Sequence, residues 1–157
     1  MPTLQLNIDP ELTFMLRHKW KGSQEVAYPL KRRASIKDIL EAVGIPHTEI
    51  GCLSTGAGEI DFSYIPVAGE LIAVAGIPVP FSVTQPSLLR PHTYAHIRFL
   101  TDLNVAKLAS LLRLAGLDTL DDGNMPDEQL ASLAAREERI LLTKDRLLLC
   151  RNKVRFG

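Results

Sequence analysis

Three aspartates in the second half of the chain stand where a predicted strand ends or a predicted helix begins. Asp102 follows a short apolar run at residues 97–101, and Asp145 follows a second apolar run at residues 139–143. Asp127 opens a helical pattern between these two runs, where a carboxylate also suits the helix dipole. Carboxylate oxygens are ligands for Mg²⁺ or Mn²⁺, and paired ions of this kind activate water and stabilise the leaving oxygen of a phosphodiester. We therefore expect a metal site that acts on phosphodiesters.

The elements that must position these aspartates alternate between strand and helix. Residues 105–115 and 127–138 have helical periodicity, and residues 117–120 between them are short enough for a middle strand. The inner faces are predicted to carry Val105, Leu108, Ala109, Leu112 and Ala115 in the first helix and Leu130, Leu133 and Ala134 in the second. Strands that alternate with helices form a parallel sheet, in which ligands bind outside the carboxyl ends of the strands. Asp102 and Asp145 both fall at such ends.

Each of these aspartates also has a purely structural interpretation. Asp127 suits the first turn of a helix whatever its function. Asp145 and Asp102 can each cap the helix that follows. The other carboxylates of this stretch are predicted to be solvated surface charges: Asp118, Asp121, Asp122 and Glu128.

The second half resembles the PIN-like ribonucleases and, among them, the Mut-seven C-terminal RNase domain. The resemblance is carried by RFLTD at 98–102, KLASLLRLAGLDTL at 107–120 and DEQLASLAAREERILLTKDRLLL at 127–149. It implies an α/β PIN-like parallel-sheet domain with metal-dependent RNase activity, in which Asp102, Asp127 and Asp145 hold Mg²⁺ or Mn²⁺. RNA is then the expected partner. Ala106 stands where the family usually has glycine in the first turn after the first aspartate.

The first half has an α+β order of elements. Residues 3–8 and 25–30 alternate like strands, and the extended runs 45–53, 59–64 and 71–74 follow a helix that is capped by Ser35 and ended by Gly44. The inner face of that helix is predicted to carry Ile36, Ile39, Leu40 and Val43. SIKDILEAVGIPHTEI at 35–50 and the pattern around residues 67–70 resemble the β-grasp, ubiquitin-like domain that precedes the Mut-seven RNase domain in some proteins. The resemblance suggests a module that binds a protein partner.

The expected domains are a β-grasp domain at 1–80, a linker at 81–96 and a PIN-like domain at 97–157. Pro86 and Pro91, with neighbouring polar residues, give the linker its composition. The family continues beyond the position of Gly157, so the PIN-like half is expected to be truncated. A half that cannot cover both faces of its sheet also suggests a homodimer. An inactive RNA- or protein-binding module is the alternative function.

Charge and composition narrow these expectations. The chain is 46% hydrophobic and 23% charged with zero formal net charge, so it has no overall basic signature of a nucleic-acid binder. A local basic run does exist near the end of the chain: Lys144, Arg146, Arg151, Lys153 and Arg155. It suits a phosphate backbone or a solvated terminus equally well. Of the basic residues, Lys107, Lys144 and Arg146 are predicted to bind phosphate.

The cysteine pattern and the length of the apolar runs bear on the cellular compartment of the protein. Cys52 and Cys150 form neither a disulfide framework nor a zinc-ligand pattern. No apolar run reaches the roughly 18 residues of a membrane span. We expect a cytoplasmic protein with no membrane partner.

Overall fold

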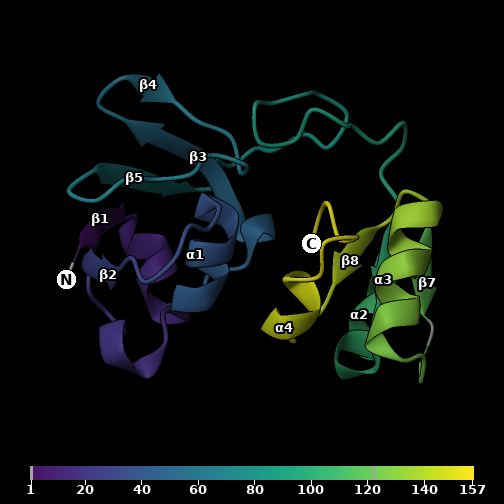
Figure 1. Cartoon of the computed structure of the whole chain (residues 1–157). Coiled ribbons are helices and arrows are strands. Elements are labelled where there is room, and N and C mark those ends of the chain that lie inside the picture. The colour runs from purple at the N-terminus through teal and green to yellow at the C-terminus, as the bar shows by residue number, and fades with distance from the viewer. Residues whose placement is uncertain (1, 122) are drawn as a thin grey trace. The chain divides into compact units, whose positions relative to one another are not determined.

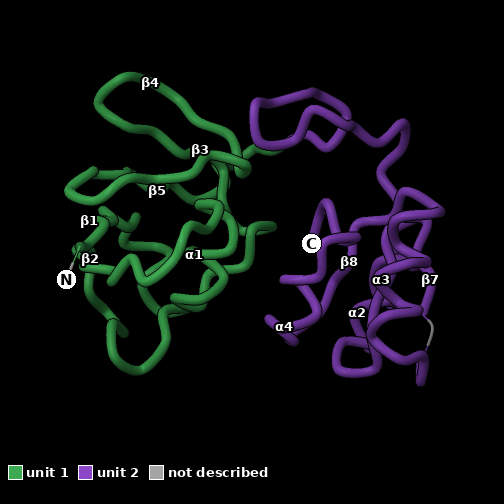
Figure 2. The backbone as a smooth tube through the Cα atoms, viewed as in Figure 1, with its two compact units in different colours: residues 1–81 green, residues 82–157 purple. Residues whose placement is uncertain are grey.

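The chain divides into two compact units. In the computed structural model, which describes residues 2–121 and 123–157, unit 1 is Met1–Phe81 and unit 2 is Ser82–Gly157 (Figure 2). Asp122, predicted to be a surface charge, lies outside the described residues.

Unit 1 is built on a mixed five-stranded sheet with the order β2-β1-β5-β3-β4 (Figure 1). Its strands are β1 (Thr3–Ile8), β2 (Glu25–Pro29), β3 (Ile50–Thr55), β4 (Gly58–Glu59) and β5 (Leu71–Gly76). The central strands β1 and β5 are parallel, and every other pairing is antiparallel. Three short 3₁₀ segments connect the elements: η1 (Pro10–Met15), η2 (His18–Trp20) and η3 (His47–Glu49).

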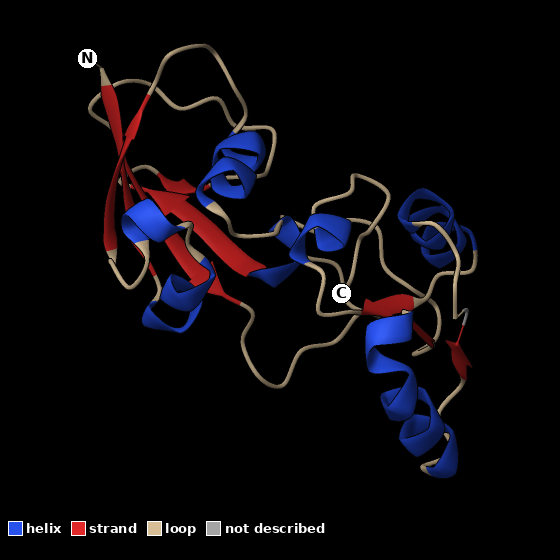
Figure 3. Cartoon of the chain, turned by 90° about the horizontal axis from the view of Figure 1, so that it is seen from below, coloured by secondary structure: helices blue, strands red, loops and turns tan. Residues whose placement is uncertain are grey.

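The single α-helix of unit 1, α1 (Ile36–Val43), begins and ends as its sequence predicts. Ser35 Oγ accepts a hydrogen bond from the Asp38 backbone N–H at 3.2 Å, which satisfies one of the free donors of the first turn. Gly44 ends the helix with φ +112°, a conformation that side chains other than glycine rarely adopt. The four predicted inner-face residues, Ile36, Ile39, Leu40 and Val43, are all buried. The helix lies beside the sheet (Figure 3).

Two predicted strands of unit 1 are shorter than their apolar patterns. The extended run predicted at 59–64 pairs only as far as Glu59. Beyond it Asp61 Oδ1 accepts hydrogen bonds from the backbone N–H and hydroxyl of Ser63, at 2.7 and 2.6 Å, which turns the chain out of the sheet. The run predicted at 45–53 becomes a strand only at Ile50, because η3 precedes it.

Unit 2 contains a separate parallel sheet, which confirms the predicted class of this half. Strand β6 (Phe99–Thr101) pairs in parallel with β7 (Thr119–Asp121) on one side and β8 (Ile140–Leu142) on the other. The helical segments are η4 (Leu103–Val105), α2 (Ala106–Leu114), α3 (Asp127–Arg136) and α4 (Arg146–Leu149). The strand predicted as the middle one, β7, is the middle strand in chain order but lies at the edge of the sheet.

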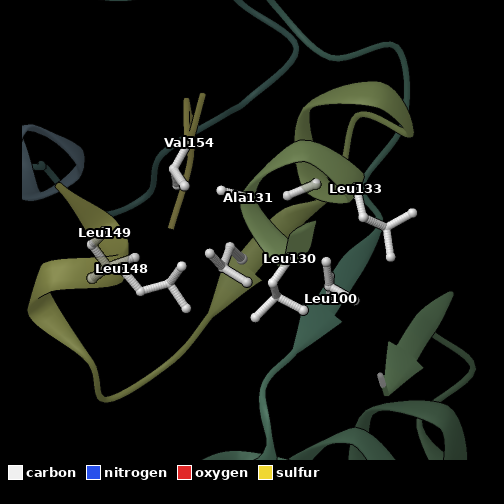
Figure 4. Close-up of a cluster of buried hydrophobic side chains, with 9 residues drawn as sticks. Leu100, Leu130, Ala131, Leu133, Leu148, Leu149 and Val154 are labelled. Carbon is white, nitrogen blue, oxygen red and sulfur yellow. The ribbon is translucent and has the colours of Figure 1, made fainter. Parts of the chain in front are cut away.

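One face of this sheet has a closed hydrophobic core. Leu100 of β6 and Leu141 of β8 pack with apolar residues of α3, α4 and the segment after α4 (Figure 4). These partners are Leu130, Ala131, Leu133, Ala134, Leu148, Leu149 and Val154. The predicted inner face of α3 is therefore confirmed.

The other helix, α2, is far less covered than its periodicity suggests. Ala109 is its one buried residue among those of the predicted inner face that lie within the helix. Leu108 is 38% exposed, Leu111 is 62% exposed and Leu114 is 84% exposed. The prediction that Leu108 belongs to an inner face is wrong in this respect, because the helix meets the sheet through a small alanine.

The segment predicted as a linker, residues 81–96, contains side chains that pack. Val83 and Tyr94 are buried with Phe156, and the rings of Tyr94 and Phe156 meet edge to face with centroids 4.7 Å apart. The Tyr94 backbone N–H also donates to the Val83 carbonyl at 2.9 Å. Residues 82–96 have no helix or strand, yet they belong to unit 2.

A buried arginine joins the strands at their amino ends. Arg139, 7% exposed, donates to Asp118 Oδ1 at 2.7 Å, to Glu137 Oε2 at 2.9 Å and to the Phe99 carbonyl at 3.2 Å. Asp118 and Arg139 immediately precede β7 and β8, and Phe99 begins β6, so one guanidinium connects all three strands. Asp118, predicted to be only a solvated charge, is a partner of this buried arginine although its side chain is half exposed.

The same contacts shift the pKa values of the three groups. Hydrogen bonding to Arg139 lowers the pKa of Asp118 and of Glu137. Burial by itself lowers the pKa of Arg139, but the hydrogen bonds and charges of the two carboxylates outweigh it and raise that pKa. The charged forms of all three groups are therefore favoured in the folded chain.

We expect Arg139→Gln to lower the free energy of unfolding of unit 2 by about 1–3 kcal/mol, because hydrogen bonds to charged groups contribute about that much. Urea denaturation followed by circular dichroism measures the change. Arg136→Gln is the matched control, since the Arg136 side chain is 74% exposed and its nearest carboxylate oxygen, on Glu137, is 3.6 Å away. Equal stability of the two variants would show that the guanidinium does not hold the strands together.

The Arg139 contacts also predict an acid dependence of stability. Because the folded pKa values of Asp118 and Glu137 are lowered, their contribution is complete above the ordinary values of 3.8 and 4.5 and is lost as the pH falls through the lowered values. The stability difference between the wild type and Arg139→Gln should therefore shrink below about pH 4. Urea titrations across this range measure it, and a constant difference would contradict the pairing.

Candidate functional site

The three predicted aspartates line one small pocket at the carboxyl ends of the strands of unit 2. The pocket has a volume of about 120 Å³, and its wall includes Asp102, Asp127 and Asp145. Asp102 directly follows the central strand β6, Asp145 follows β8, and Asp127 is the first residue of α3. Parallel pairing places the ends of β6 and β8 at the same edge of the sheet. Asn104, Asn124 and Met125 complete much of the remaining wall.

Asp102 is the buried carboxylate of this pocket. Its side chain is held by Oδ2, which accepts hydrogen bonds from Thr143 Oγ1 at 2.5 Å and from Asn104 Nδ2 at 3.2 Å. The residue is only 8% exposed. Its other oxygen, Oδ1, is buried and has no hydrogen-bond partner in the part of the chain that the structure describes. A buried charged oxygen without a partner is costly, so this atom is suited to a cation or a tightly held water.

Thr143 connects the ends of the two strands. Its hydroxyl donates to Asp102 Oδ2 and accepts the backbone N–H of Asp145 at 2.9 Å. It can make both bonds because it is the first residue after β8 and β8 is paired with β6. In the sequence, Thr143 stands only as the last residue of the apolar run at 139–143. Its polar side chain at a strand end, two residues before an aspartate, was the available signal.

Asp145 has the structural role that the sequence left open. It caps α4, since its Oδ1 accepts the backbone N–H groups of Leu147 at 2.8 Å and Leu148 at 3.4 Å. Both of these bonds use the same oxygen. The cap therefore fixes the carboxylate while it leaves Oδ2 out of these two bonds, and a capping role and a ligand role are compatible.

Asp127 is the exposed member of the three. It occupies the first position of α3, where its charge favours the helix dipole. Pro126 precedes it at the cap position and provides no side-chain hydrogen bond. Asp127 therefore has the position of an ordinary first-turn acid, and it also lines the pocket.

The carboxylate oxygens of the pocket are ligands of the type that a hard divalent cation prefers, although they do not form a complete coordination shell. Among residues 2–121 and 123–157, no group of three or more His, Cys, Asp or Glu side chains is arranged to hold a metal ion. Mg²⁺ does not need such a cage, because it keeps several waters and takes only one or two carboxylates from the protein. A water occupies about 30 Å³ in the liquid, so a pocket of about 120 Å³ has room for an ion with a few waters. The unpartnered Asp102 Oδ1 would be one direct ligand of such an ion.

The predicted phosphate-binding cations lie outside the pocket wall. Lys107 is exposed on α2, Lys144 is exposed just before Asp145, and Arg146 is the exposed first residue of α4. None of the three is among the described residues that line the pocket. Two of them, Lys144 and Arg146, adjoin Asp145 in the chain.

Comparison with known families divides the chain at nearly the same place as the structure does. Residues 1–81 match the family described as Mut7-C ubiquitin, and residues 97–157 match the family described as Mut7-C RNAse domain. These matches confirm both resemblances that the sequence suggested. Comparison with curated proteins and with solved structures gives no match. None of the helices in the described part of the chain has the length and apolar character to cross a membrane.

We expect Thr143→Val to lower the free energy of unfolding of unit 2 by about 1–2 kcal/mol, because the change leaves Asp102 Oδ2 and the Asp145 N–H without their shared partner. Thr143→Ser keeps the hydroxyl and should retain most of the stability. Thermal unfolding of the two variants decides between them. Equal losses in both would assign the effect to the methyl group and contradict the bridging role.

Proposed function

Because the chain belongs to the Mut7-C ubiquitin family and its residues 97–157 match the Mut7-C RNAse domain, we propose that it is a divalent-metal-dependent ribonuclease whose active site is the pocket around Asp102. The observation that carries the proposal is the buried, unpartnered Oδ1 of Asp102, a residue that lines a pocket together with Asp127 and Asp145. An oxygen in this state calls for a cation, and the family assigns RNA chemistry to this unit. The reaction is the hydrolysis of an RNA phosphodiester.

The residues that would hold Mg²⁺ or Mn²⁺ in this proposal are Asp102 through Oδ1, Asp145 through Oδ2 and Asp127 at the start of α3. When bound, such an ion polarises a phosphoryl oxygen and offsets the negative charge that develops on the leaving oxygen. Thr143 keeps Asp102 in place by its hydrogen bond to Oδ2, and the N-terminus of α4 keeps Asp145 in place. The two carboxylates therefore need little rearrangement to bind.

Outside the pocket, the chain must attract a polyanion to an edge that is itself acidic. Lys107, Lys144 and Arg146 serve this purpose in the proposal, since each is exposed and the last two are next to Asp145 in the chain. Lysine and arginine offset phosphate charge and orient the backbone without reading the bases. Unit 1 would select a protein partner, as the ubiquitin-like family suggests.

A second candidate function is an RNA- or protein-binding module without catalytic activity. It is favoured by the finding that the carboxylates of the described residues are not grouped as a metal site. In that case Asp145 is simply a helix cap and Asp127 a first-turn acid. Cleavage assays separate the two functions directly.

We expect Asp145→Asn to reduce Mn²⁺- or Mg²⁺-dependent cleavage of single-stranded RNA by about 10²-fold or more, because the amide loses the charge that binds the ion. Asparagine is also a good helix cap, so the fold should persist. Asp121→Asn is the matched control: Asp121 ends the neighbouring strand β7 and is exposed, but it does not line the pocket. The measurement is the single-turnover cleavage rate.

Wild-type protein that cleaves no faster than Asp145→Asn with either metal would remove the enzyme proposal in favour of the binding module. A loss of activity in Asp121→Asn as large as in Asp145→Asn would instead move the site away from the pocket.

A further inference from the structure

The segment that follows α4 carries cations on a fixed framework. Val154 is 1% exposed and Phe156 is 3% exposed, while Arg151, Lys153 and Arg155 are exposed. Exposed and buried residues alternate from 153, at the end of a turn, to 156, so one side of this segment faces inward. The Leu141 backbone N–H donates to the Phe156 carbonyl at 3.0 Å, which attaches the segment to β8. Its cations therefore project from a packed segment and not from a loose end.

Lys153 is placed near the pocket by a specific contact. Its Nζ donates to Ser132 Oγ on α3 at 2.8 Å. Ser132 lies five positions after Asp127, the pocket residue at the start of the same helix. At about 1.5 Å per residue, the contact is roughly 8 Å along the helix from the acidic end of the site.

Arg155 extends the line of cations away from the pocket. Burial raises the pKa of Tyr94, the positive charge of Arg155 lowers it, and Glu138 raises it, so both charged groups lie near Tyr94. Glu138 precedes β8 and is therefore at the amino end of the sheet, opposite the pocket. From Lys153 to Arg155 the extended chain advances about 7 Å. Together with Lys144 beside Asp145, these cations follow a course from the pocket toward the opposite edge.

Few carboxylates stand along this course, and Glu138, which acts on Tyr94 together with Arg155, is one of them. From Arg139 to Gly157 the one acidic side chain is Asp145. Among the described residues, no ion pair involves Lys144, Lys153 or Arg155. A solvated surface is the ordinary outcome for such charges. Here, however, the Lys153 side chain is held by Ser132, and Lys144 directly precedes Asp145, a residue of a pocket that is lined by carboxylates.

We propose that Lys144, Lys153 and Arg155 form a basic track that binds successive phosphates of a single-stranded RNA leading to the pocket. The inference rests on the proposed function, because it takes the pocket as the place of cleavage. Lys153 and Arg155 are both exposed and two residues apart on one packed segment, where they can meet neighbouring phosphates of a single strand. The described part of unit 2 has three Phe, Tyr or Trp residues. Tyr94 and Phe156 are buried and Phe99 is partly buried, so none is an exposed ring on which a base could stack. The track therefore contacts the phosphate backbone of the RNA and binds RNA of any base sequence.

The test compares two variants of the full chain that lose the same charge. Lys153→Gln/Arg155→Gln removes two cations of the track, and Arg32→Gln/Arg33→Gln removes two exposed cations of unit 1. Binding of a fluorescent oligouridylate of about 12 nucleotides is measured by anisotropy in EDTA over a range of KCl concentrations. Each lost phosphate contact on a single strand reduces the slope of log K against log salt by about 0.7.

The track variant should therefore show a slope smaller by about 1.4 and roughly tenfold weaker binding at low salt, whereas the control variant keeps the wild-type slope. Equal slopes in both variants would overturn the track. Competition by polyglutamate as strong as competition by unlabelled RNA would also overturn it, since the surface would then be a general anion binder.

Cleavage of the same oligonucleotide with Mn²⁺ separates this inference from the proposed function. If the wild-type protein cleaves and the track variant binds RNA as the control variant does, the ribonuclease proposal stands and the track is contradicted. If the wild-type protein binds RNA but does not cleave it, and the track variant shows the predicted change of slope, the track stands and the ribonuclease proposal is contradicted. Wild-type protein that binds no RNA removes both.

Discussion

The pairing of β6 with β8 in parallel is the contact on which the candidate site depends. It brings the residues that follow both strands to one edge, where Thr143 reaches Asp102 and the Asp145 N–H at once. The hydroxyl needs both partners within hydrogen-bonding distance, so a shift of register by one residue would remove it from the site. The apolar residues Leu100 and Leu141, which are packed under α3 and α4, fix that register.

The two ends of this sheet differ in whether their buried polar side chain has hydrogen-bond partners for all of its atoms. At the amino ends, the Arg139 guanidinium is enclosed by Asp118, Glu137 and a backbone carbonyl, so its charge is matched. At the carboxyl ends, Asp102 keeps one buried oxygen with no partner among the described residues. Removing a partner from a paired buried charge is strongly destabilising, and a buried polar oxygen without a partner costs stability unless something binds there. This asymmetry distinguishes an edge that holds the sheet together from an edge suited to a ligand.

In unit 1 the helices and strands are specified by local sequence features. The Ser35 cap, the αL conformation of Gly44 and the alternation of β1 each agree with the tertiary structure around them. Agreement of this kind between local preference and global fold is typical of sequences that fold to one state. In unit 2 the agreement is weaker at α2, whose leucines remain exposed although the helix has an apolar periodicity.

The sequence by itself determined the order and type of the elements, the parallel class of the second sheet and the positions of three aspartates at element ends. These features depend on periodicity, caps and spacing, which are local properties of the chain. It did not reveal the bridge by Thr143, the pairing of Asp118 with Arg139 or the burial of Tyr94 against Phe156, because each joins residues far apart in the chain. It placed Leu108 on the inner face of α2, which is wrong, because helical periodicity shows which side chains share a face but not how far the fold covers that face. Only the tertiary structure decided which of these groups are buried and paired, because burial depends on the elements that pack above a residue and not on its neighbours in sequence.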